Sequence, residues 1–156
     1  FTAKYQRELA DAVSIPVFAS SLLLVPLIAR MLQSSKKVGI ITADARYITD
    51  RHYAGVGIDK ETVRLIGLEH AKEFSEVVFA DKPNMDVSMV EQEVVDAART
   101  LTSEDPEVGA ILLECSLLPP FAHAVQQAVG LPVFDFTTMI NMVHSTLIRT
   151  PFRGFL

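Results

Sequence analysis

One residue near the end of a predicted buried strand has the chemistry of an acid, a base and a nucleophile. Cys115 is the single cysteine of the 156-residue chain and lies just beyond an apolar run over residues 108–113, which ends in Glu114. We predict that a helix begins at Pro119, and its N-terminus would lower the pKa of Cys115 below the ~8.5 of a free thiol. Cys115 is therefore the best candidate for a catalytic residue, and an inert core thiol is the alternative.

Hydroxyl and phenol groups are expected to lie close to Cys115. In an open parallel sheet, ligands bind outside the carboxyl ends of the strands. The residues placed there that could bind a substrate are Ser20, Ser21, Thr42, Tyr47 and Ser116. Together with backbone N–H groups they could hold a substrate carboxylate. Each of them singly could instead cap a helix or form part of a wall, so the prediction rests on their clustering at one rim.

Acidic residues also fall at this predicted rim, namely Asp44, Glu69 and Glu114. Because carboxylates repel an anionic substrate, we interpret them as helix caps or solvated groups. The four histidines include no pair three or four residues apart, which argues against a metal site, and we interpret them as solvated or satisfied surface residues. Gly55 and Gly57 could begin a dinucleotide fingerprint, but Lys60 occupies its third glycine position, so we reject NAD or FAD binding.

The elements that would position these residues alternate along the chain. Strands are predicted over residues 15–19, 37–42, 63–68, 108–114 and 132–136. Helices are predicted over residues 3–13, 22–32, 86–101 and 119–129, with others beginning near Thr49 or Asp50 and at a cap on Thr137 or Thr138. This order predicts an α/β fold, a parallel sheet flanked by helices on both faces.

Composition limits the partners and the compartment. A chain with 49% hydrophobic residues can bury the core of one domain, and a net charge of −5 without a basic stripe argues against nucleic acid as a partner. Residues 12–32 are apolar but are interrupted by Pro16, Pro26 and Arg30, so we predict no membrane span. One cysteine cannot form an internal disulfide, which favours the cytoplasm.

Three segments carry a resemblance to a known family: residues 38–42, residues 109–116 and residues 130–135. They resemble the second lobe of the aspartate/glutamate/hydantoin racemase superfamily. The resemblance implies a flavodoxin-like lobe of a two-lobe fold, in which Cys115 and Ser116 take the place of the second-lobe Cys-Thr motif. Ser116 departs from the commoner Thr, and Glu114 stands where many members have Gly.

The resemblance also implies how the chain is divided. Its first six residues resemble the helix that follows the first-lobe Cys-Gly, so the partner cysteine would lie just before Phe1. Residues 1–35 would then belong to, or bridge to, a missing N-terminal lobe, and residues 36–136 would form the C-terminal lobe. Residues 137–156 would be a helix and tail that pack back toward the first lobe. A homodimer or higher homo-oligomer is expected.

The activity implied is cofactor-independent racemisation of an amino acid or hydantoin. Two thiols would act on opposite faces of the α-carbon, one removing a proton and the other returning one. The substrate would be a small carboxylate or amino-acid-like molecule, and this chain would be an incomplete enzyme. Open alternatives are a maleate isomerase, an arylmalonate decarboxylase-like enzyme, and a non-catalytic α/β protein that binds small molecules or self-associates.

Overall fold

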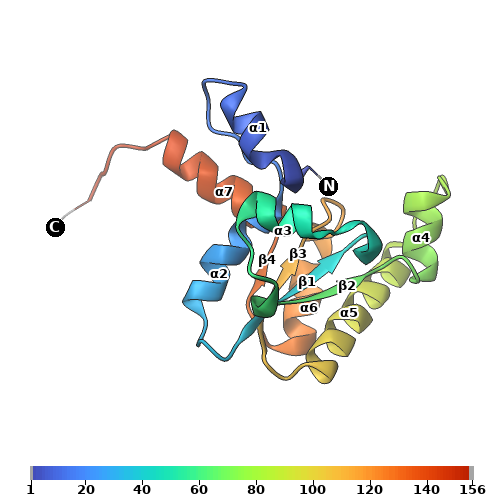
Figure 1. The fold of residues 1–156 in the computed structure, drawn as a ribbon. Helices are drawn as coiled ribbons and strands as arrows, with labels where there is room; N and C mark the ends of the chain where they lie inside the picture. Colours follow the sequence, from blue (N-terminus) through green and yellow to red (C-terminus); the bar gives the residue numbers. More distant parts are fainter. Residues whose placement is uncertain (1, 155–156) are drawn as a thin grey trace.

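A four-stranded parallel sheet forms the centre of the computed structural model, which describes residues 2–154 (Figure 1). Its strands are β1 (Lys37–Thr42), β2 (Val63–Gly67), β3 (Val108–Leu113) and β4 (Val133–Phe134). The order across the sheet is β2-β1-β3-β4, which is the flavodoxin-like order. The predicted α/β class with a parallel sheet flanked by helices is confirmed, and β1 and β3 are the two central strands.

Helices cover both faces of the sheet. The α-helices are α1 (Gln6–Asp11), α2 (Val25–Met31), α3 (Asp50–Val56), α4 (Lys72–Phe79), α5 (Val87–Glu104), α6 (Ala122–Val129) and α7 (Phe136–Leu147). Short 3-10 turns are η1 (Ala3–Tyr5), η2 (Ser21–Leu24), η3 (Ala45–Tyr47), η4 (Lys60–Thr62) and η5 (Pro119–Phe121). Figure 1 shows α5 and α6 on one side of the sheet and α2 and α3 on the other.

Two apolar clusters lie on the two faces, because successive strand side chains point to opposite sides. On one face Ile41 and Ile111 pack with residues of α5 and α6, and Cys115 lies at the margin of this cluster. On the other face Ile40 and Leu112 pack with residues of η2, α2, α3 and α7. The two central strands are thus buried on both sides, as their continuous apolar sequences predict.

The segment at residues 15–19 is not a strand, contrary to the prediction. Its backbone C=O and N–H groups form hydrogen bonds with a side chain instead of with a neighbouring strand. The Gln6 amide nitrogen donates to the Val17 carbonyl at 2.9 Å, and its amide oxygen accepts from the Ala19 N–H at 2.9 Å. Pro16 has no N–H to offer a ladder. The Gln6 side chain therefore takes the place of a strand neighbour.

The end of β4 and the start of α7 also differ from the prediction. Strand β4 has only two residues, and Asp135 comes directly after it. Asp135 caps α7, and its Oδ1 accepts a hydrogen bond from the Thr138 N–H at 2.7 Å. The predicted caps Thr137 and Thr138 therefore lie inside the helix. Helix α4 was not predicted at all. Its first N–H groups are satisfied by a carboxylate of α5, since Glu93 accepts from the Glu73 and Phe74 N–H groups at 2.7 and 2.8 Å.

Candidate active site

Cys115 lies two residues beyond the end of β3, at the carboxyl edge of the sheet. The ladder continues one step past the strand, because the Glu114 N–H donates to the Ile41 carbonyl at 2.8 Å. Cys115 is half-buried and lines a cavity of about 170 Å³ together with Ala43, Glu114, Ser116 and Phe136. The predicted position at the end of a central strand, open to a cavity, is confirmed; the catalytic role stays a prediction.

The pKa of the Cys115 thiol is raised, not lowered as predicted. Burial raises it most, and the negative charge of Glu114 adds to the rise, while a hydrogen bond from the Leu117 backbone opposes it. The helix expected to begin at Pro119 starts later, because the chain first forms the 3-10 turn η5 and α6 begins only at Ala122. At neutral pH the resting residue is therefore mainly a thiol.

Glu114 is the centre of the hydrogen-bond network beside Cys115. Its Oε2 accepts from the Thr42 hydroxyl at 2.8 Å, and its Oε1 accepts from the Ser20 hydroxyl at 3.4 Å. The Ser21 hydroxyl donates to the Glu114 carbonyl at 3.5 Å. Because only 6% of Glu114 is exposed, the interpretation of this residue as a helix cap or solvated carboxylate is wrong.

The structure separates the predicted substrate-binding residues into two groups. Ser116 lines the cavity with Cys115. Ser20, Ser21 and Thr42 are buried, do not line the cavity and form hydrogen bonds with Glu114. Ser20 also caps η2 by accepting from the Leu22 N–H. Tyr47 is 60% exposed and is not among the residues that line the cavity. Direct substrate binding by any of these residues stays a prediction.

The other acidic rim residues have local partners. Asp44 is buried and pairs with Arg46, whose guanidinium holds the pKa of Asp44 below its usual value. Glu69 accepts from the Ala45 N–H at 3.2 Å. The capping interpretation fits both residues. His52, by contrast, is not a surface histidine, since it is buried and forms a capping box with Thr49 at the start of α3.

Three residues of the cavity wall, Ala43, Glu114 and Phe136, were missed as site residues. Phe136 follows β4 as Cys115 follows β3, but the strand predicted over residues 132–136 included it, so the rule that ligands bind beyond strand ends did not point to it. Glu114 was noticed, but its charge was weighed only against an anionic substrate. Its burial could not be predicted from the sequence because it depends on η2, which is distant in the chain.

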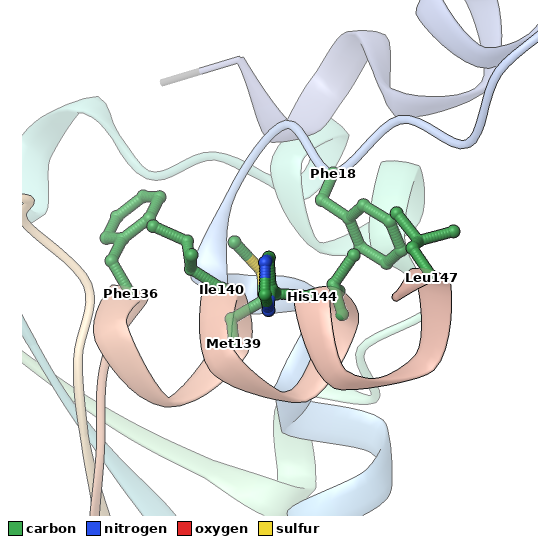
Figure 2. A pocket seen from close by; sticks show the side chains of 7 residues that line it. Phe18, Phe136, Met139, Ile140, His144 and Leu147 are labelled. Carbon is green, nitrogen blue, oxygen red and sulfur yellow. The ribbon is translucent and has the colours of Figure 1, made fainter. Parts of the chain in front are cut away.

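A larger apolar groove adjoins the cavity at Phe136. It has a volume of about 430 Å³ and is lined by one face of α7 and by Phe18. Figure 2 shows Phe136 and Ile140 at the first turns of α7, and Phe18 next to Leu147 near its end. His144 is the sole titratable side chain in this wall, so the groove offers binding surface and little chemistry.

Neither a metal-binding cluster nor a membrane-spanning helix is found among the described residues. Within residues 2–154, no group of three or more His, Cys, Asp or Glu side chains is placed to hold a metal ion. None of the helices described combines the length and apolar character that crossing a bilayer requires.

Curated relatives of this chain are named as lyases. The chain is 33% identical over 136 residues to a dimethylsulfoniopropionate lyase of Durusdinium sp. clade D, covering 84% of the chain and 44% of the relative. It is 30% identical over 160 residues to dimethylsulfoniopropionate lyase 7 of Emiliania huxleyi, covering 97% of the chain and 46% of the relative. Lyase 5 of the same organism is 26% identical over 161 residues, covering 99% of the chain and 32% of the relative. The chain thus spans less than half the length of these relatives.

These names correct the expected activity. Racemisation was expected from the resemblance to the racemase superfamily, but the relatives that match nearly the whole chain are lyases, so the racemase prediction is wrong. A solved structure, allantoin racemase from Pseudomonas fluorescens, shares 18% identity with a TM-score of 0.43, covering 85% of this chain and 57% of that one. No family model matches the chain.

Proposed function

We propose that this chain forms the Cys115-bearing part of an enzyme that cleaves dimethylsulfoniopropionate. The observation that carries the proposal is its similarity to curated dimethylsulfoniopropionate lyases along 84–99% of its length. The cavity at Cys115 supports it, because a candidate proton-transfer group lies there at a strand end. The compartment of the enzyme stays a prediction.

The reaction follows from the substrate's own chemistry. Dimethylsulfoniopropionate carries a sulfonium on the carbon next to the one that bears the carboxylate. Cys115 rests mainly as a thiol, so it first loses its proton to solvent. The thiolate then removes a proton from the carbon next to the carboxylate, and that C–H electron pair forms the new double bond. The bond from carbon to sulfur breaks, and its electron pair leaves with dimethyl sulfide. Acrylate remains, and the proton on Cys115 passes to solvent.

The cavity is too small to enclose such a substrate completely. Its volume of about 170 Å³ lies below the ~300–1,000 Å³ of typical small-molecule pockets. In our proposal the described residues supply one wall of the substrate site. Groups that hold the substrate carboxylate come from residues outside this sequence, in a natural polypeptide as long as the relatives. Activity is therefore proposed for the longest natural polypeptide that contains this sequence.

The test measures dimethyl sulfide release. The longest natural polypeptide is expressed, given dimethylsulfoniopropionate, and the dimethyl sulfide and acrylate formed are measured by gas chromatography and NMR. We expect release in equal amounts, and a loss of about 10²–10⁴-fold in kcat for Cys115→Ser, because a serine hydroxyl is a far weaker acid than a thiol.

A matched control keeps the interpretation clear. Glu69→Gln alters a residue of the same rim that does not line the cavity, and we expect it to retain most of the activity. Full activity in Cys115→Ser, with its folded state confirmed by circular dichroism, would refute the assigned role of Cys115. An absence of dimethyl sulfide from the folded wild-type polypeptide would refute the proposed function itself.

A further inference from the structure

Glu114 differs from every other buried carboxylate of the described chain. Glu73 is buried against Lys82, and Asp44 is buried against Arg46. Asp135 has the positive N-terminus of α7, which it caps. Glu114 has neither kind of partner: within residues 2–154 it accepts hydroxyl hydrogen bonds, and none of the ion pairs includes it.

A buried carboxylate without a positive partner is costly, because burial removes the water that would solvate its charge. Hydroxyl donors recover part of that cost but bring no net charge. Glu114 also lines the cavity that contains Cys115. A cationic ligand in this cavity would supply the missing positive charge.

The wall of the cavity fits one kind of cation better than another. The N–H bonds of an ammonium group require acceptor sites, and the hydroxyl hydrogen bonds already occupy about two of the four acceptor sites of the Glu114 carboxylate. A trialkyl sulfonium has no N–H to donate, so it is recognised by electric field and by aromatic faces. Phe136 supplies an aromatic side chain and Ala43 an apolar one in the same wall.

We propose that Glu114 and Phe136 bind the sulfonium end of the substrate and make the cavity selective for permanently charged onium carboxylates. This inference rests on the proposed function, because dimethylsulfoniopropionate is the onium carboxylate concerned. Glu114 and Cys115 are consecutive in the chain and line one cavity. A sulfonium held beside Glu114 therefore brings the carbons next to it toward the Cys115 thiol.

The test compares two ligands of the same shape that differ in charge. In 4-methylpentanoate a C–H replaces the sulfonium sulfur of dimethylsulfoniopropionate, so the positive charge is lost and the shape is kept. Binding of both is measured by NMR titration on the longest natural polypeptide carrying Cys115→Ser, which slows turnover. We expect that Glu114→Gln reduces the preference for the charged ligand about tenfold, a loss at the lower end of the range for a buried charge pair.

Glu69→Gln is the matched control, since it removes a carboxylate from the same rim at a residue that does not line the cavity. We expect it to keep the preference of the wild type. If Glu114→Gln weakens both ligands equally, its role is structural and the inference is overturned. It is also overturned if Glu114→Gln changes neither affinity.

Failure of this inference is separable from failure of the proposed function. Release of dimethyl sulfide with an unchanged affinity ratio in Glu114→Gln would overturn the onium site alone. A Glu114-dependent preference for the charged ligand in a protein that releases no dimethyl sulfide would support the onium site and overturn the lyase proposal.

Discussion

Cys115 and Glu114 are consecutive residues whose side chains contact different parts of the molecule. The thiol packs at the margin of the cluster that contains α5 and α6. The carboxylate bonds to Thr42 at the end of β1 and to Ser20 before η2. The two residues follow β3 directly and continue the alternation of side chains along that strand, which leaves a base candidate and a buried negative charge in one cavity wall.

The reactivity of Cys115 provides a prediction at this scale. Burial and the Glu114 charge raise the pKa of the thiol, so its alkylation by iodoacetamide should have a midpoint above the ~8.5 of a free thiol. Because the thiolate is the reactive form, alkylation at neutral pH should be slower than in the unfolded chain. Glu114→Gln should lower the midpoint, since it removes a negative charge that disfavours the thiolate.

The pH profile is measured by mass spectrometry on the folded protein and on the protein unfolded in urea. Glu69→Gln is the control for the loss of one acidic residue, and it should leave the midpoint of the folded protein unchanged. A folded midpoint at or below that of the unfolded chain would contradict the prediction.

At the scale of elements, helix α7 depends on a single buried cap. Asp135 accepts from both the N–H and the hydroxyl of Thr138, at 2.7 and 2.9 Å. We expect Asp135→Ala to lower the free energy of unfolding by about 1 kcal/mol, because it leaves first-turn N–H groups without a partner. Asp135→Asn retains a capping oxygen and should cost less. Urea denaturation followed by circular dichroism measures both, and equal losses would show that the cap itself contributes little.

The elements also show how far the sequence was informative. β1, β3 and α5 were predicted within a few residues, because each has a continuous or periodic apolar pattern of its own. α4 was missed because its first turn is capped by Glu93 of another helix, which leaves no local signal. The false strand at residues 15–19 has strand-like residues, but its partner is the Gln6 side chain.

The candidate site divides in the same way. Cys115 could be predicted because the end of an apolar run identifies the end of a strand, and the structure confirms that position. The roles of Glu114 and Ser20 could not be predicted, because they depend on a contact between residues far apart in the sequence. The predicted direction of the Cys115 pKa was wrong because burial raises the pKa most, and the helix expected at Pro119 begins only at Ala122.

At the scale of the whole molecule, the groove along α7 and Phe18 leaves large apolar side chains exposed. Ile140 is 58% exposed and Leu147 is 62% exposed, and both line the groove. Contiguous exposed apolar surface of this kind marks an interaction site in many proteins. The sequence predicts a homo-oligomer, and this face is where we expect self-association to occur.

We predict that two copies of the chain associate through this groove and that Leu147→Lys weakens the association. In the single chain Leu147 is exposed, so the substitution should leave the thermal midpoint of unfolding nearly unchanged. In a dimer paired through this face, the lysine would bury an unpaired charge. Light scattering coupled to size-exclusion chromatography should give a dimer or larger assembly for the wild type and a monomer for Leu147→Lys. Met31→Lys, at an exposed apolar residue of α2 outside the groove, should associate as the wild type does. Equal masses for all three proteins would show that α7 does not mediate self-association, and its apolar face would then require a different covering partner.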